Sequence, residues 1–286
     1  MEARAVDPVE FRDGQRQQWN KSAQGWRKWS GLIDEATSGV SQRLVELAGV
    51  EAGSRVLDVA AGYGEPSSTA ARVAGAQGRV VATDISAEML AYGRERAQAA
   101  GLSNIEFVEA DVSSLDFEPE SFDAALSRWG IIFEPDGETA AGRIRGFLKA
   151  GGRMAISSWG PPDRVPMLGI PVMTVMQRLG IAPPPPGTPG PLSRPTPEAI
   201  GGLLEGGGFS DVQVEEAEVT MDVASPEEFT TYIREVAPPI TAMMADRSQE
   251  EQDATWDAVT EAVRATVGGD GRVKLTNLAL LASGRA

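Results

Sequence analysis

The sequence predicts an α/β fold in which a doubly wound, mostly parallel sheet of seven strands is flanked by helices and carries helical cap insertions. Three observations lead to this prediction. Short apolar segments alternate with helical segments from residue 55 to residue 158. A turn with two glycines, Gly62 and Gly64, follows the first apolar segment. Acidic residues stand at the ends of successive apolar segments, where open α/β sheets bind their ligands.

The region before the first strand is predicted to be helical. Residues 1–50 hold Trp19, Trp26 and Trp29 among charged residues, followed by apolar residues at spacings of three and four, which are typical of an amphipathic helix. The pattern ends at Gly53. Because the region is apolar but lies outside the alternating segments, we expect it to form a helical lid over the sheet.

The core is predicted over residues 51–160. Short segments rich in β-branched and aliphatic residues predict its strands, at 55–60, 79–83, 105–109, 122–127 and 152–158. Helical segments connect most of these strands, at 67–76, 87–100 and 138–148. Strands joined by helices of these lengths form βαβ crossovers, which give a parallel sheet with helices on both faces.

A first excursion follows the core. Residues 161–210 hold a methionine-rich helical segment at 167–179. The run from Pro183 to Pro186 then excludes both a helix and a central strand. We therefore expect a cap insertion with a return helix here.

The last part of the chain returns to the sheet. Residues 211–286 supply the last two strands, at 211–223 and 273–282, with an acidic helical insertion at about 226–267 between them. The length of 286 residues suits one core with insertions as well as it suits two domains.

Composition excludes several kinds of function. The chain has no Cys and no His, which excludes thiol nucleophiles, imidazole bases and metal sites built from these residues, and we expect no metal. The net charge of −15 argues against a nucleic-acid partner. The N-terminus lacks a secretory pattern, and no stretch of about 18 apolar residues suits a membrane span. We therefore expect a cytoplasmic protein, monomeric or homodimeric, with a small-molecule substrate and no membrane partner.

The glycine turn is the most informative segment. Residues 56–67 read VLDVAAGYGEPS, an apolar strand that carries Asp58 and ends in a turn with Gly62 and Gly64 before the next helix. Glycines let a ligand approach the backbone N–H groups at the start of a helix. The two glycines also match the start of a dinucleotide-binding loop, and Asp84 follows about 20 residues later, where such a loop has its ribose-binding acid.

Several features count against a dinucleotide site. Ser67 replaces the third glycine, Asp58 precedes the loop inside the strand, and Pro66 is not needed by such a loop. The residues of hydride transfer are also missing, because no tyrosine is followed four residues later by lysine and there is no histidine. An NAD(P)-dependent oxidoreductase or epimerase is therefore kept only as an alternative.

The loop instead resembles motif I of the class I methyltransferases that use S-adenosylmethionine, and the resemblance extends in register along the core. It implies a Rossmann-like, seven-stranded methyltransferase sheet, S-adenosylmethionine as cofactor and S-adenosylhomocysteine as product. The cofactor-binding residues expected with this resemblance are Trp26, Asp58, Ala60, Gly62, Gly64, Asp84, Ile85, Met89, Asp111, Val112 and Ser127.

The resemblance also implies a role for each acid. Asp58 is expected to face the methionyl ammonium group, directly or through water. Asp84 is expected to accept both ribose hydroxyls, which two carboxylate oxygens can do together. The apolar residues after the second strand would pack on the adenine, Asp111 would bind its amino group, and the Val112 N–H would bind a ring nitrogen.

The nearest subgroup is the small-molecule enzymes similar to the ubiquinone and menaquinone biosynthesis methyltransferases. The resemblance covers residues from about 50 to 158. One departure is the pair Ala60 and Ala61, which stands where many members carry Gly-Cys or Gly-Ser. This departure is expected to alter the packing of the loop and to leave the cofactor unchanged.

The methyl acceptor is predicted to be a small, largely apolar metabolite that is methylated at carbon, nitrogen or oxygen. Its expected contacts are Trp19, Trp29, Arg128, Trp129, Phe133 and Trp159. Arg128 is expected either to anchor an acidic substrate or to pair with Glu134 or Asp136. A methyl group on a sulfonium is already electrophilic, so we expect in-line SN2 transfer with alignment as the main catalytic device. No catalytic residue is assigned, and a protein that binds the cofactor without catalysis is a second alternative.

Overall fold

The computed structural model describes residues 8–185 and 187–286. Residues 1–7 of the predicted lid and Pro186 of the proline run therefore lie outside the described residues. The strands are β1 (Arg55–Val59), β2 (Arg79–Asp84), β3 (Ile105–Glu109), β4 (Phe122–Arg128), β5 (Leu148–Trp159), β6 (Ser210–Val223) and β7 (Val273–Arg285).

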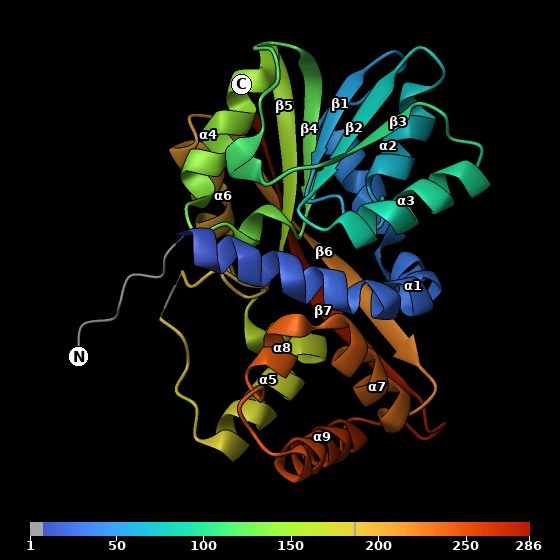
Figure 1. Cartoon of the computed structure of the whole chain (residues 1–286), viewed down its shortest axis with the longest axis vertical. Helices are drawn as coiled ribbons and strands as arrows, with labels where there is room; N and C mark the ends of the chain where they lie inside the picture. Colours follow the sequence, from blue (N-terminus) through green and yellow to red (C-terminus); the bar gives the residue numbers. More distant parts are fainter. Residues whose placement is uncertain (1–7, 186) are drawn as a thin grey trace.

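These strands form one sheet in the order β3-β2-β1-β4-β5-β7-β6 (Figure 1). Neighbouring strands from β3 to β5 are parallel, whereas β7 runs antiparallel to both β5 and β6. β1 and β2 are buried except at their first residues, as expected for parallel strands covered on both faces. The predicted α/β sheet of seven mostly parallel strands is confirmed.

Helices flank the sheet close to where the sequence predicts them. The core helices are α2 (Ser67–Ala74), α3 (Ala87–Ala99), α4 (Gly137–Phe147) and α6 (Pro197–Gly206). Figure 1 shows α2 and α3 beside the β1–β3 half of the sheet, and α4 and α6 beside the other half. Side chains of Ser86, Asp136 and Thr196 accept backbone N–H groups at the first turns of α3, α4 and α6, which fixes where these helices begin.

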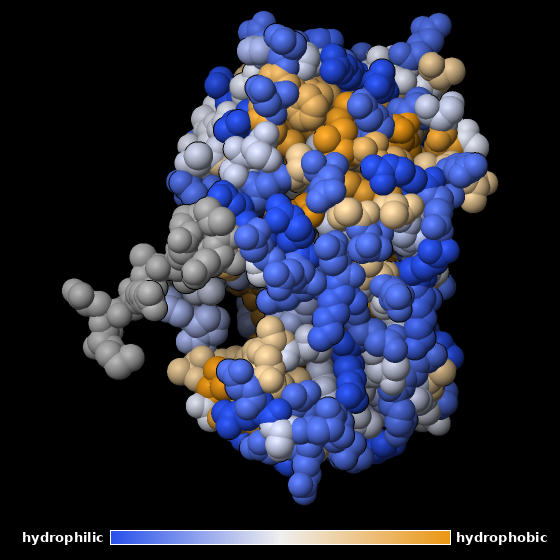
Figure 2. Space-filling view, viewed as in Figure 1, coloured by the Kyte–Doolittle hydropathy of each residue, from blue (hydrophilic) through white to orange (hydrophobic). Residues whose placement is uncertain are grey.

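The predicted N-terminal helical region is one continuous helix, α1 (Pro8–Leu47). Its C-terminal half packs into the core through buried residues at helical spacing, among them Ile33, Val40 and Leu44. In Figure 1, α1 crosses the molecule below the core, and the same band of the surface in Figure 2 is largely hydrophilic. The helix therefore presents a polar face to solvent and its apolar side chains to the interior.

The two excursions form a second group of helices below α1 (Figure 1). They contribute α5 (Pro166–Leu179), α7 (Pro226–Val236), α8 (Pro238–Ala242) and α9 (Gln249–Arg264). β6 and β7 are 14 and 13 residues long and extend from the core to this group. The acidic insertion forms three helices, because Pro238 begins a new helix after α7 and Ser248 caps α9. No helix in the described residues has both the length and the apolar composition that a membrane crossing requires.

Candidate functional site

A large cavity lies at the carboxyl ends of the parallel strands, the edge at which open α/β sheets bind ligands. It offers about 230 Å³ to the centres of water molecules, and a single water needs only about 10–15 Å³ of such space. The lining extends from the residues after β3, across β2, β1, β4 and β5, to β6 and α7. One face of α1 lines the cavity through Phe11, Arg12, Gln15, Trp19, Trp26, Ile33 and Thr37.

The glycine turn between β1 and α2 forms one wall of the cavity. Gly62 has φ +54°, and a Cβ atom built on it would meet no atom within 4 Å, so its left-handed backbone faces open space. Gly64 has φ +95° and lies behind the wall, where a Cβ atom would be 3.5 Å from the Cα of Gly93. Ala60 also has a positive φ, +57°, a conformation that costs a non-glycine residue roughly 1–2 kcal/mol. The alanine at this position therefore adopts a backbone better suited to glycine.

Asp84 brings a carboxylate to this wall from the end of β2. One oxygen accepts the Gly62 N–H at 2.8 Å, and the other accepts the Ser86 N–H at 2.8 Å. Burial raises the pKa of Asp84 to about 6, although these backbone N–H groups lower it. Because a carboxylate has about four lone-pair sites, Asp84 keeps acceptor capacity toward the cavity that it lines.

Asp58 is buried behind the glycine turn and does not line the cavity. Its Oδ2 accepts the hydroxyl of Ser67, at the first turn of α2. Its Oδ1 is buried without a hydrogen-bond partner among the described residues. Burial raises the pKa of Asp58 to about 7, against the opposing effect of the Ser67 hydrogen bond. A buried carboxylate oxygen normally accepts a hydrogen bond, so this position fits a site in which a ligand, or a water beside it, donates to Oδ1.

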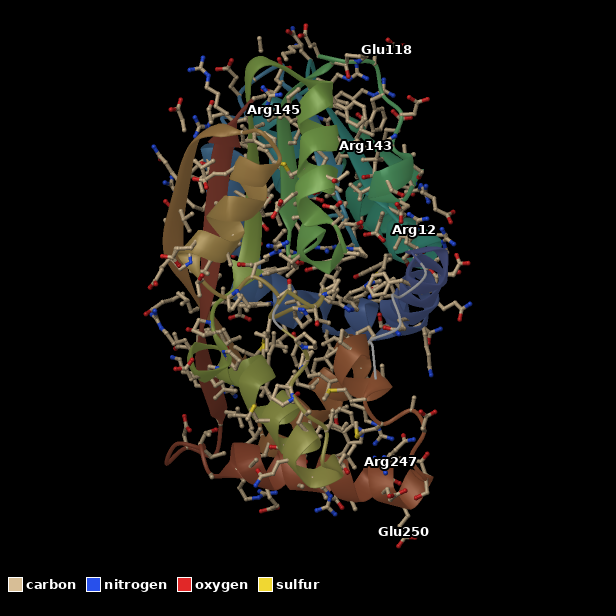
Figure 3. The ribbon with its side chains drawn as sticks, turned by 90° about the vertical axis from the view of Figure 1, so that its left-hand side faces the viewer. Arg12, Glu118, Arg143, Arg145, Arg247 and Glu250 are labelled. Carbon is tan, nitrogen blue, oxygen red and sulfur yellow. The ribbon has the colours of Figure 1, made fainter. Side chains whose placement is uncertain are left out.

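The β3 end of the cavity is lined by Asp111 and Val112, which follow β3. Asp111 caps the short helix η1 (Val112–Ser114), and its Oδ1 accepts the Ser113 N–H at 2.7 Å and the Ser113 hydroxyl. Its Oδ2 lies 3.8 Å from Nε of Arg12, and Arg12 also donates to the Ser113 hydroxyl at 2.9 Å. Figure 3 labels Arg12 where the N-terminal end of α1 approaches the core. These contacts tie α1 to the β3 end of the cavity.

Arg128 lies at the end of β4, lines the cavity and is buried. Its guanidinium donates to the hydroxyls of Thr37 at 2.7 Å, Ser41 at 3.0 Å and Tyr63 at 3.2 Å. Tyr63 in turn donates to Asp34 at 2.9 Å. The predicted pairing of Arg128 with Glu134 or Asp136 is wrong, because the side chain points to α1 and binds its hydroxyls.

Aromatic side chains form much of the remaining wall. Trp129 and Trp159 stack with their ring centroids 4.3 Å apart and their planes 10° apart. The Trp129 indole N–H is buried without a hydrogen-bond partner in the part of the chain described. Trp19 packs edge-on against Phe133 with their ring centroids 5.3 Å apart, and the ring centroids of Trp26 and Tyr63 lie 5.6 Å apart.

Most of the residues expected from the sequence are brought together in this lining, and four are not: Asp58, Gly64, Ser127 and Trp29. The buried hydroxyl of Ser127 accepts the Ile131 N–H at 2.9 Å and shapes the turn after β4. Trp29 points away from the cavity, with its Nε1 bonded to Glu235 and its ring against Tyr232. The positions of Ser127 and Trp29 are therefore explained by packing behind the wall.

From the sequence, we expect the segment after Trp159 to border the acceptor, but no site residue is assigned to the wall made by the second group of helices. It consists of Met167 and Leu168 of α5, Val219 and Met221 of β6, and Tyr232, Ile233, Val236, Ala237, Pro239 and Ile240 around α7 and α8. The apolar spacing within 226–236 could have identified a buried helix face, but no local pattern says which cavity that face would meet. Tyr63 was also missed, although it stands between the two glycines of the turn.

The described residues contain no group of three or more His, Cys, Asp or Glu side chains that could hold a metal ion.

The two buried acids predict an unusual pH dependence of stability. Because burial raises the pKa of Asp58 to about 7 and that of Asp84 to about 6, the native state binds protons more tightly than the unfolded chain between pH 4 and 7. Burial also raises the pKa of Glu134 to about 7, so the free energy of unfolding, measured by urea denaturation without ligand, should rise by roughly 4–6 kcal/mol between pH 8 and pH 5. Asp84→Asn should remove only the smaller part of this dependence, because the pKa of Asp58 is higher, and a stability that falls over the same range would contradict the prediction.

Comparison with known proteins agrees with this arrangement. Residues 56–152 match a family described as a methyltransferase domain. The ubiquinone/menaquinone biosynthesis C-methyltransferase UbiE of Pseudomonas fluorescens is 36% identical over 142 residues, which are 48% of this chain and 56% of that protein. The chain thus matches about half the length of the curated relatives.

Solved structures share the fold over more of the chain. The YcgJ protein from Bacillus subtilis has a TM-score of 0.54 at 18% identity, covering 86% of this chain and 98% of that one. Phosphoethanolamine N-methyltransferase 2 from Haemonchus contortus, solved with phosphomonomethylethanolamine and S-adenosylhomocysteine, has a TM-score of 0.56 at 20% identity. That match covers 98% of this chain and 60% of the nematode protein. At these identities the likeness concerns the fold.

Proposed function

We propose that this chain, whose residues 56–152 form a class I S-adenosylmethionine-dependent methyltransferase domain, methylates a small, largely apolar molecule. The observation that carries the proposal is a cavity with two unlike halves. Its β3–β1 half combines the glycine turn with Asp84 and Asp111. The half beyond β4, formed by β5, β6, α5, α7 and α8, contributes uncharged side chains to the lining.

The first half fits the cofactor. Asp84 would accept the ribose hydroxyls, and the open left-handed backbone at Gly62 leaves room for the cofactor against the turn. The free Oδ1 of Asp58 would receive the methionyl ammonium group through a water, because Asp58 itself stands behind the wall. The adenine would lie at the β3 end, beside the apolar side chains of Ile85 and Met89.

The chain's contribution to the reaction is alignment and the exclusion of water. When bound, the cofactor supplies a methyl group on a positively charged sulfur, which is electrophilic without acid catalysis. The charged residues of the lining are Arg12, Glu65, Asp84, Asp111, Arg128 and Glu134, and none of them comes from β5, β6, α5, α7 or α8, which form the half beyond β4. That half therefore offers no carboxylate base within the described residues, and we assign in-line SN2 geometry, enforced by the walls, as the main catalytic device.

The acceptor is proposed to bind in the uncharged half. The stacked indoles of Trp129 and Trp159 offer a flat apolar wall, and an oxygen atom on the acceptor would satisfy the unpaired Trp129 N–H. The UbiE relatives are named C-methyltransferases, so carbon acceptors are the first to test, before nitrogen and oxygen acceptors.

Two measurements test the proposed function. Titration calorimetry with S-adenosylhomocysteine and with NAD should give binding of the first and none of the second. Incubation with S-adenosylmethionine and a panel of aromatic and terpenoid acceptors should then give a product heavier by one CH₂ group in mass spectrometry. Binding of NAD alone would support the oxidoreductase alternative, and cofactor binding without any methylated product would support a silent binding protein.

We also propose that the N-terminal half of α1 acts as a lid. It covers the cavity, is tied to the β3 end through Arg12, and touches α7 at Gly25, where a Cβ atom would lie 2.2 Å from the Glu235 carbonyl oxygen. In this proposal, α1 moves away from the cavity to admit a ligand and returns once the ligand is bound.

The lid predicts a ligand effect on hydrogen exchange. S-adenosylhomocysteine should slow amide exchange in residues 11–30 at least several-fold, because bound ligand holds the helix closed. Exchange in α9, which lies on the far side of the second helix group, serves as the control. Arg12→Ala should speed exchange in the free protein over the same residues. Exchange in residues 11–30 that ignores the ligand would contradict a lid.

A further inference from the structure

The uncharged half of the cavity contains a buried tyrosine whose hydroxyl has no partner. The chain has three tyrosines. The hydroxyl of Tyr63 donates to Asp34, and the hydroxyl of Tyr92 is bonded to that of Ser30. Tyr232, on α7, is 5% exposed and lines the cavity. Its hydroxyl makes no hydrogen bond with any residue that the structure describes.

The hydroxyl of Tyr232 faces open space. The fully enclosed side-chain polar atoms that lack a hydrogen bond, within the described residues, belong to Asp58, Arg96, Ser121 and Trp129. Tyr232 is not one of these residues, so its unpartnered hydroxyl reaches open space, which is the cavity that its side chain lines. A polar group of a buried side chain normally has a hydrogen-bond partner, so this position suits a polar atom of a bound molecule or a water that such a molecule displaces.

Tyr232 is the polar point of an otherwise apolar wall. Of the described residues that β6, α5, α7 and α8 contribute to the lining, Tyr232 carries the only side-chain oxygen or nitrogen. The adjoining indoles of Trp129 and Trp159 carry N–H groups, which only donate. Burial raises the pKa of Tyr232 above its usual range, so the phenol stays protonated and can donate at neutral pH. These walls therefore offer hydrogen-bond donors without a charge, which complements an uncharged oxygen atom.

Contacts with α1 place Tyr232 near the border between the two halves of the cavity. One helical turn after Tyr232, the Val236 carbonyl accepts the indole N–H of Trp26 at 3.1 Å. The ring centroid of Trp26 lies 5.6 Å from that of Tyr63, which stands between the two glycines of the turn. Trp29, which does not line the cavity, packs edge-on against the Tyr232 ring with the centroids 5.6 Å apart. A path of packed side chains thus connects the glycine turn to the part of α7 that carries Tyr232.

We infer that the Tyr232 hydroxyl donates a hydrogen bond to an uncharged oxygen atom of the methyl acceptor, such as a ketone oxygen, and makes the site selective for such molecules over hydrocarbons of the same shape. The inference rests on the proposed function, since it assumes that the acceptor occupies the uncharged half. A hydrocarbon would bury the hydroxyl without a partner, whereas a ketone would satisfy it.

Tyr232 acts here as a specificity-determining residue and takes no part in making or breaking bonds. It lies outside residues 56–152, the part of the chain that matches the methyltransferase domain. The selectivity would therefore come from the insertion between β6 and β7 and not from the cofactor-binding core.

The test measures the binding of matched probes to the protein saturated with S-adenosylhomocysteine. The probes are α-tetralone with tetralin, and camphor with bornane, two pairs in which CH₂ replaces the ketone. The proteins are the wild type, Tyr232→Phe, Trp129→Phe and, as a matched control, Tyr92→Phe, which removes a phenol hydroxyl outside the cavity. Fluorotryptophan labelling reports each titration by fluorine NMR, because tryptophans line the acceptor half. Thermal unfolding of each variant checks that the fold is kept.

We expect Tyr232→Phe to shift the ratio of the two dissociation constants in each pair about tenfold in favour of the hydrocarbon. The ketone loses its donor, and the hydrocarbon no longer buries an unpaired hydroxyl. The variant should keep the melting temperature and the affinity for S-adenosylhomocysteine, because this hydroxyl has no protein partner to lose. Trp129→Phe should shift the ratio less, and Tyr92→Phe should leave it unchanged.

Three outcomes separate an error about Tyr232 from a failure of the proposed function. If the wild type binds S-adenosylhomocysteine and a folded Tyr232→Phe keeps the wild-type ratio, or if Trp129→Phe alone shifts it, Tyr232 does not select the oxygen. If none of the four probes binds to the wild type that holds S-adenosylhomocysteine, the uncharged half does not accept such molecules and the inference is also wrong. If the wild type does not bind S-adenosylhomocysteine, the proposed function itself is wrong and the inference falls with it.

Discussion

Asp84→Ala should weaken the binding of S-adenosylhomocysteine by roughly 1.5–3 kcal/mol, which is about 10- to 150-fold in the dissociation constant. The carboxylate is the charged acceptor proposed for the ribose hydroxyls, and it also holds the glycine turn through the Gly62 N–H at 2.8 Å. Its removal therefore deletes a ligand contact and frees the loop that borders the ligand. Calorimetry on the folded variant measures the loss directly.

Two further variants separate the contact from the loop. Asp84→Asn keeps the shape and one acceptor oxygen but turns the other position into a donor, so it should lose affinity while retaining the fold. Glu88→Ala removes an exposed acid from the first turn of α3 and should leave the affinity unchanged. An unchanged dissociation constant in both Asp84 variants would show that the ribose is held elsewhere.

The β1–α2 turn and the strand ends could be predicted from sequence because their signals are local. A buried strand, two glycines and a helix within 56–74 fix the backbone path, and the expected turn forms with Gly62 and Gly64 at positive φ. Asp84 is the last residue of β2 and Asp111 stands two residues after the end of β3, so the parallel register alone brings them to one edge of the sheet. At these positions the place of a residue in the sequence, at or just after a strand end, is enough to predict its place in the fold.

The acceptor half of the cavity could not be predicted, because it depends on contacts between distant segments. The indole of Trp26 donates to the Val236 carbonyl at 3.1 Å, across 210 residues of sequence. The approach of α1 to α7 depends on Gly25, which in the sequence indicates only a residue of low helix propensity. Trp29 lies on the same helix, yet it faces Glu235 and Tyr232 behind the wall. Apolar spacing identifies a helix with a buried face but not the partner of that face.

Arg128 illustrates the same limit for a charged residue. The sequence indicates that a cation at the end of a central strand needs partners. Acids a few residues away were the nearest candidates in the sequence, whereas the structure supplies hydroxyls of α1 and of the glycine turn. The long α1 helix is thus anchored to the sheet by a buried guanidinium as well as by apolar packing.

Replacing this guanidinium should cost the protein much of its stability. Arg128→Met keeps an apolar stem of similar length but removes the hydrogen bonds to Thr37, Ser41 and Tyr63. We expect the free energy of unfolding to fall by roughly 2–4 kcal/mol, because charged hydrogen bonds are lost and Asp34 loses a nearby cation. Arg128→Lys should lose less, because it keeps the charge but not the planar fork. Urea denaturation of the two variants gives both values.

A double variant in α1, which removes the hydroxyls that Arg128 binds, decides whether Arg128 anchors α1 or binds substrate. Thr37→Val with Ser41→Ala removes the α1 partners and leaves the guanidinium in place and buried without them. If Arg128 anchors α1, this double variant should be destabilised about as much as Arg128→Met and should show faster hydrogen exchange in α1. If Arg128 instead binds an acidic substrate, Arg128→Met should keep the wild-type stability and lose affinity for that substrate, while the double variant should bind it normally. If neither Arg128→Met nor the double variant changes the stability, Arg128 does not anchor α1, and binding of an acidic substrate becomes its expected role.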